Sequence, residues 1–126
     1  MNVFEKLKNG DPVDMTSEEY RPAIAELMRA DRALFQLNNA EPQSEEQKKA
    51  FEELFDGPMP EGLGIFTPTQ IDFPKQISFG THVFINHSFT AMSIGGIDFG
   101  DCPAWGRQHG YRNSAAHCGG PENPAG

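Results

Sequence analysis

Apolar residues recur every six positions between Ile71 and Gly100, and this spacing is the strongest pattern in the chain. An ordinary strand repeats with a period of about 2 and a helix with a period of about 3.6, so neither needs this spacing. A parallel β-helix does, because each short turn sends matched side chains into a shared interior. The repeat runs in two registers, two residues apart: Ile71, Ile77, Val83 and Phe89, then Phe73, Phe79, Ile85 and Ala91, ending with Ile97.

The residues before the repeat show helical spacing instead. A short helix is predicted over residues 2–9, a longer one from Pro22 to about Asn39, and a third after Ser44, which with Gln47 forms a capping box. We expect residues 1–57 to be a helical cap that is too thin for a core of its own and that packs against the repeat. The two apolar stripes consist of Ile24, Leu27, Met28, Leu34 and Phe35, and of Ala50, Phe51, Leu54 and Phe55.

Residues 58–70 are rich in proline and glycine and are interpreted as an irregular connector to a partial β-helix over residues 71–101. A coil of such a helix takes roughly eighteen residues, and burial needs about three stacked units. The repeat supplies fewer than two coils, so we expect one apolar end to stay uncovered.

The tail, residues 102–126, contains no Ile, Leu, Val, Met or Phe. Such a segment cannot offset its ordering entropy by apolar burial, so the tail is predicted to be irregular and disordered. The abrupt change at Asp101 suggests the hypothesis of a frameshift there, since the tail codons permit a hexapeptide-like coil in the next reading frame. The DNA sequence around codon 102 tests it.

The formal net charge of −8 argues against a nucleic-acid or anionic-membrane partner. No apolar run reaches the roughly 20 residues of a membrane span, and no signal peptide is evident, so a soluble cytoplasmic protein is expected. A zinc site is conceivable from the tail residues Cys102, His109, His117 and Cys118. Their spacing does not match that of usual zinc sites, so no metal is predicted.

The whole of residues 1–101 resembles the maltose and galactoside O-acetyltransferases, a branch of the hexapeptide-repeat acyltransferases. The resemblance is carried by EKLKNGDPVDM, ELMRADRALFQLNN and FEELF in the helical part, followed by ISFGTHVFINHSFTAMSIGGIDFGD in the repeat. It implies a mostly β fold, in which a left-handed parallel β-helix follows the helical cap, and a homotrimer with active sites between subunits.

The same resemblance implies transfer of an acetyl group from acetyl-CoA to a sugar hydroxyl. A histidine would remove the hydroxyl proton as the oxygen attacks the thioester, while N–H donors stabilise the oxyanion. Two acceptor-binding positions carry over, Asp14 in GDPVDM and Asn86 in VFINHS. The alternatives from the residues alone are a helix-capping Asp14 and an Asn86 that simply suits a β-helix corner.

The general base has no clear counterpart. His117 lies one residue from the expected distance after Gly100-Asp101, but its surroundings, SAAHCGG, do not match the family pattern. His82 and His87 precede that position and are interpreted as surface residues. The coils that bind coenzyme A have no counterpart either. We therefore expect an inactive acetyltransferase chain, the alternative being a non-catalytic interaction or oligomerisation fragment.

Overall fold

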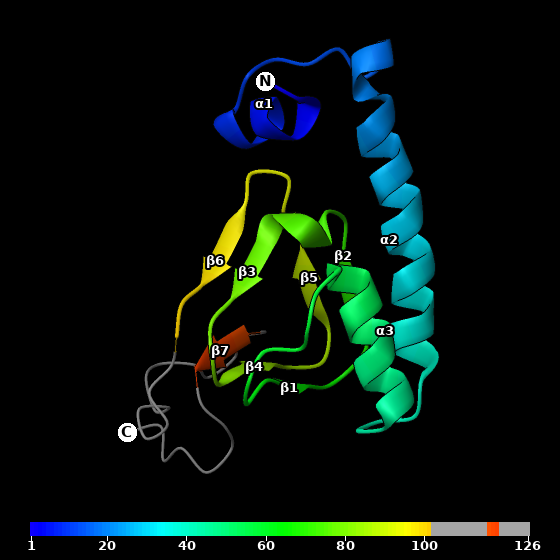
Figure 1. Cartoon of the computed structure of the whole chain (residues 1–126), viewed down its shortest axis with the longest axis vertical. Helices are drawn as coiled ribbons and strands as arrows, with labels where there is room; N and C mark the ends of the chain where they lie inside the picture. Colours follow the sequence, from blue (N-terminus) through cyan, green and yellow to red (C-terminus); the bar gives the residue numbers. More distant parts are fainter. Residues whose placement is uncertain (102–115, 119–126) are drawn as a thin grey trace.

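The computed structural model describes residues 1–101 and 116–118, and within them helices cover one side of a set of short parallel strands (Figure 1). The longest helix, α2, runs the length of the molecule, while α1 lies across one end and α3 lies between α2 and the strands. No helix in this part of the chain is long and apolar enough to cross a membrane. The helices are α1 (Val3–Asn9), α2 (Arg21–Asn39) and α3 (Glu45–Phe55), with short 3-10 helices η1 (Glu18–Tyr20) and η2 (Pro74–Gln76).

The ends of the helices follow local sequence signals. Asn2 and Glu5 form a reciprocal capping box at the start of α1, and Gly10 ends it in the left-handed conformation with φ of 82°. Ser44 accepts the Gln47 backbone N–H at the start of α3, as predicted. Thr16 and Glu19 also have the spacing of a capping box, but Thr16 does not cap a helix, because its hydroxyl donates to Asp14 instead.

The buried face of α2 differs from the predicted stripe. Ile24, Met28 and Phe35 were expected inside, yet their side chains are 45%, 63% and 64% exposed. The helix instead turns a face rich in alanine inward, because small side chains let its backbone approach α3 and the strands closely. The buried residues of α2 are Ala23, Glu26, Ala30, Ala33, Leu34 and Leu37.

The strands form three parallel pairs, and in each pair the partners are separated by the same number of residues. Gly64 pairs with Phe84, Thr69 with Phe89 and Ile77 with Ile97. The chain thus passes twice through the same three sheets, and it does so from Gly64, earlier than the repeat indicates. The strands are β1 (Gly64–Ile65), β2 (Thr69–Ile71), β3 (Ile77–Phe79), β4 (Val83–Ile85), β5 (Phe89–Ala91) and β6 (Ile97–Phe99).

The interior of this strand region, residues 64–99, confirms the six-residue pattern. The first and third residues of β2, β4 and β5 are buried and the middle residue is not, as a period of about 2 within each strand requires. Paired strands place similar residues side by side: in β3 and β6, Ile77 pairs with Ile97 and Phe79 with Phe99. The rings of that last pair stack at 5.4 Å with an interplanar angle of 7°.

The helices and strands share their main core, as expected of a thin helical cap. Phe51 and Leu54 of α3 and Leu37 of α2 are 1% exposed or less, and they belong to one cluster with Ile71 and Ile85. A smaller cluster holds the N-terminal segment, in which Val3, Tyr20 and Ala23 surround Phe73.

A polar contact also joins the two regions. The Asn38 side chain on α2 accepts the Thr69 backbone N–H at 2.9 Å and donates to the Thr69 carbonyl at 2.8 Å. The amide thereby takes the place of a neighbouring strand at the outer edge of β2.

Only three residues of the predicted disordered tail are described. Ala116–Cys118 forms β7, which pairs antiparallel with β4, His117 lying opposite Phe84. These three residues thus have extended structure, contrary to the expectation, because strand pairing needs backbone groups and not apolar side chains. The rest of the tail, residues 102–115 and 119–126, lies outside the described residues.

Candidate functional site

Asp14 lies at the surface in the segment before η1, where its carboxylate forms a local turn. Its Oδ1 accepts the Thr16 backbone N–H at 2.9 Å and the Thr16 hydroxyl at 2.7 Å. The hydroxyl bond, and after it the backbone bond, lowers the pKa of Asp14 below its ordinary value. The carboxylate is therefore ionised at neutral pH, and Oδ2 forms no hydrogen bond within the described residues. The predicted alternative, a helix cap, does not occur, since the bonded N–H belongs to a turn.

Asn86 follows the last residue of β4 at the corner before β5. Its side-chain oxygen accepts the backbone N–H of His87 at 2.9 Å, and Ser88 completes the corner with a φ of 66°. This geometry agrees with the alternative interpretation of Asn86, in which a short polar side chain supports a tight turn at a β-helix corner. The side-chain amide of Asn86 keeps its N–H donors for other partners.

An aromatic pair beside Asn86 was not predicted. Phe66 and Phe84 meet edge to face at 5.3 Å, and Phe66 is 49% exposed. The Phe66 backbone N–H donates to the Ile85 carbonyl at 2.9 Å, which places the Phe66 backbone next to the residue before Asn86. The sequence does carry a signal for Phe84, because it stands between the two inward positions of β4 and must point outward.

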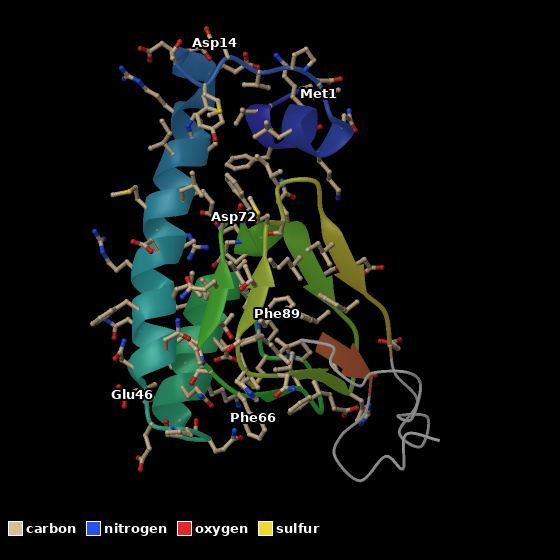
Figure 2. All side chains as sticks on the ribbon, turned by 180° about the vertical axis from the view of Figure 1, so that it is seen from behind. Met1, Asp14, Glu46, Phe66, Asp72 and Phe89 are labelled. Atoms are coloured by element: carbon tan, nitrogen blue, oxygen red, sulfur yellow. The ribbon has the colours of Figure 1, made fainter. Side chains whose placement is uncertain are left out.

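The structure does not bring Asp14 and Asn86 together within one chain. Figure 2 places Asp14 at one end of the long axis and Phe66, which marks the Asn86 corner, at the opposite end. A site that used both residues would need two copies of the chain.

The histidines take different positions. His82 is partly buried with φ of 60°, and its backbone N–H donates to the Glu61 carbonyl, whereas His87 is exposed. The backbone of His117 lies opposite Phe84, and so near the Asn86 corner. Among the described residues, no group of three or more His, Cys, Asp or Glu side chains could hold a metal ion. Cys102 and His109 of the considered zinc site lie outside these residues.

Comparison with known proteins identifies the fold. No family model matches the chain, and no curated protein matches it by sequence. A solved structure does match: a hexapeptide-repeat-containing acetyltransferase from Vibrio cholerae O1 biovar eltor, in complex with acetyl coenzyme A. The likeness has a TM-score of 0.64 at 24% sequence identity, and it covers 94% of this chain and 68% of the other. The chain therefore has the fold of a hexapeptide-repeat acetyltransferase.

Proposed function

We propose that this chain belongs to the acetyl-CoA-dependent O-acetyltransferases, with a sugar hydroxyl as acceptor, and that it retains the acceptor side of the site but does not turn over. One observation carries the proposal: parallel strand pairs with a constant register, covered by three helices, share the fold of an acetyltransferase that was solved with acetyl-CoA. The left-handed β-helix and the maltose and galactoside branch are part of the same proposal.

The acceptor chemistry rests on Asp14 and Asn86. An ionised carboxylate with a free oxygen accepts a hydrogen bond from a sugar hydroxyl, and a side-chain amide donates to a second one. The exposed ring of Phe66 offers an apolar surface for the sugar body. Since Asp14 and Asn86 lie at opposite ends of the molecule, we place them in one acceptor site only across two copies. The expected homotrimer, with active sites between subunits, would provide such an arrangement.

The expected lack of turnover rests on the general base. Direct acyl transfer requires a base within hydrogen-bond reach of the acceptor hydroxyl. The family resemblance places that histidine in a further parallel coil, whereas His117 lies in β7, which runs antiparallel to β4. His117 therefore has a different backbone direction from the one that the resemblance requires, and we assign it no catalytic role.

Sugar binding tests the proposal independently of turnover. Saturation-transfer NMR of the full chain with maltose and with a galactoside should show binding that Asp14→Asn and Asn86→Ala each weaken by about fivefold, as expected for a lost hydrogen bond. Asp11→Asn, on a nearby exposed carboxylate, is the matched control and should change nothing. If neither sugar binds, or if Asp14→Asn binds them equally well, the acceptor assignment is wrong.

An acetyl transfer assay tests the inactivity. We expect no release of coenzyme A thiol above the background rate with maltose, a galactoside or glucose. Acetyl-CoA-dependent turnover that His117→Ala abolishes would contradict this expectation and would identify His117 as the base.

A second candidate function is a non-catalytic interaction fragment. It is favoured by unpaired strand edges: within the described residues, β5 and β6 each pair with one strand only. Such edges can pair with another chain. Size-exclusion chromatography should then show concentration-dependent assembly, and a stable monomer with a cooperative melt would count against it.

A further inference from the structure

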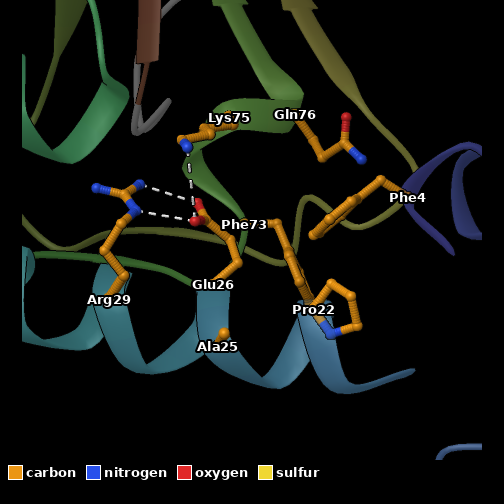
Figure 3. Close-up of a pocket in the computed structure, with 8 residues that line it drawn as sticks. All are labelled: Phe4, Pro22, Ala25, Glu26, Arg29, Phe73, Lys75 and Gln76. Carbon is orange, nitrogen blue, oxygen red and sulfur yellow. Dashed lines mark hydrogen bonds and ion pairs between the residues drawn. The ribbon is translucent and has the colours of Figure 1, made fainter. Parts of the chain in front are cut away.

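A cavity of about 460 Å³ lies between α1, α2 and η2, and neither Asp14 nor Asn86 lines it. Its volume is within the usual range for small-molecule sites. The wall combines an apolar part with a charged part (Figure 3): Phe4, Pro22, Ala25, Glu26, Arg29, Phe73, Lys75 and Gln76.

The apolar part of the wall holds two aromatic rings in fixed positions. Phe4 of α1 and Phe73 meet edge to face at 6.4 Å and 72°, and Pro22 at the start of α2 lies beside them. Phe73 is only 3% exposed, because Val3, Tyr20 and Ala23 pack around it. A ligand body that fits against these rings must be apolar, and a ring suits the edge-to-face geometry that aromatic groups prefer.

The charged groups of the wall, Glu26, Arg29 and Lys75, all lie close to a group of opposite charge. Glu26 is 8% exposed, and Arg29 binds both of its oxygens, at 2.8 and 2.9 Å. Lys75 lies 3.9 Å from Glu26 and 3.6 Å from Asp56. Each cation of the wall therefore has a carboxylate beside it, and one of these carboxylates, Asp56, lies outside the wall. An anionic ligand would compete with the carboxylates for Lys75, and a cationic ligand would meet Lys75 and Arg29, so an uncharged ligand is favoured.

Gln76 supplies the polar group that is available to a ligand. Figure 3 shows its amide beside Phe4 and across the cavity from Pro22. Its side chain makes no hydrogen bond within the described part of the chain, while its backbone N–H donates to Phe73. The amide can thus donate and accept at once, and Lys75 adds a donor that is not held at hydrogen-bond distance.

We propose that this cavity binds a small uncharged molecule with an aromatic or alicyclic body and a head group that both donates and accepts hydrogen bonds. The body packs against Phe4, Pro22 and Phe73, and the head group meets Gln76 and Lys75. This activity is separate from acetyl transfer, so failure of either proposal leaves the other standing.

Three probes of the same size and different charge test the assignment: benzamide, benzoate and benzamidine. In NMR titrations of the full chain at millimolar concentration, benzamide should bind at least about fivefold more tightly than the two charged probes. The backbone signals of Phe4, Glu26 and Gln76 should shift. If a charged probe binds as tightly as benzamide, if none of the three binds, or if the shifts lie elsewhere, the proposal is wrong.

Variants separate the head-group contact from a general loss of structure. Gln76→Ala should weaken benzamide binding by about fivefold. Gln70→Ala is the matched control, since Gln70 lies on the outward face of β2 and lines a different groove. Both variants should melt at the temperature of the unchanged chain. Equal weakening by the two variants would overturn the assignment of Gln76.

Discussion

The strand region and the helices differ in how firmly local sequence determines which side chains are buried. In the strands, backbone pairing at a constant register decides which positions face inward, so Val83 and Ile85 are buried wherever the pairing holds. A helix satisfies its backbone internally and can rotate about its axis until one face suits its neighbours. The α2 helix therefore buries Ala30 and Ala33 and leaves Phe35 exposed. A hydrophobic stripe indicates a helix more reliably than it indicates the face that is buried.

The largest expected effect tests whether the helices depend on the strands. Phe51→Ala should lower the free energy of unfolding by about 3–5 kcal/mol, because the ring is 1% exposed and packs in the core shared by α3 and the strands. Phe35→Ala, which removes the same ring from the exposed face of α2, should change it by about 0.5 kcal/mol or less. Urea unfolding followed by circular dichroism measures both values.

Either of two results would contradict the expected dependence of the helices on the strands. Equal effects of the two phenylalanine variants would mean that the predicted stripe, and not the alanine face, is buried. Loss of the α3 amide signals with those of β4 intact would mean that helices and strands unfold separately.

A smaller effect is expected where a single side chain joins the regions. Asn38→Ala should lower the free energy of unfolding by about 2 kcal/mol, because it leaves the N–H and carbonyl groups of buried Thr69 without their partners. Asn39→Ala removes only a bond to the Phe35 carbonyl of its own helix, so about 0.5 kcal/mol or less is expected. Thermal or urea unfolding distinguishes them, and equal losses would contradict a specific role for Asn38.

The smallest expected effect is a change in the pKa of Asp14, in the turn before η1. Thr16→Ala should raise the pKa of Asp14 toward its ordinary value, because the hydroxyl bond is the main cause of the lowering. Ser17→Ala should leave it unchanged, since Ser17 donates to the Asp14 carbonyl and not to the carboxylate. NMR titration of the side chain measures both values.

The direction of the accompanying pH dependence follows from the lowered pKa. Folding lowers the pKa of Asp14, so its contribution to stability is present above the unfolded-state pKa and is lost as the pH falls through the folded-state pKa. Thr16→Ala should reduce this contribution. An unchanged Asp14 pKa in that variant would show that another group holds the carboxylate.

The sequence predicted the parts of the fold that repeat. It anticipated the helices, the inward positions of the strands and the packing of the helices against them, because the helices and strands each have a local period or a capping signal. It missed β1, since Gly64-Ile65 is too short to show a period and is fixed only by pairing with β4. It also missed Asn38 as a link, because an asparagine inside a helix gives no sign of which backbone it will meet.

The candidate site was less predictable than the fold. Asp14 and Asn86 came from the family resemblance, and their own contacts within the chain are those of ordinary turns. The cavity wall was unpredictable because Phe4, Pro22 and Gln76 are far apart in the sequence and meet only after α1 packs over Phe73. Side chains that meet from distant elements produce no periodic pattern in the sequence.

The Asn38 amide at the edge of β2 also makes the two edges of the β2–β5 sheet different from each other. An open strand edge is a template on which another chain can extend a sheet. At this edge the template is already occupied, because a side chain of α2 satisfies both backbone groups of Thr69. Any further strand should therefore add to this sheet at β5 and not at β2, so that growth of the sheet has a single polarity.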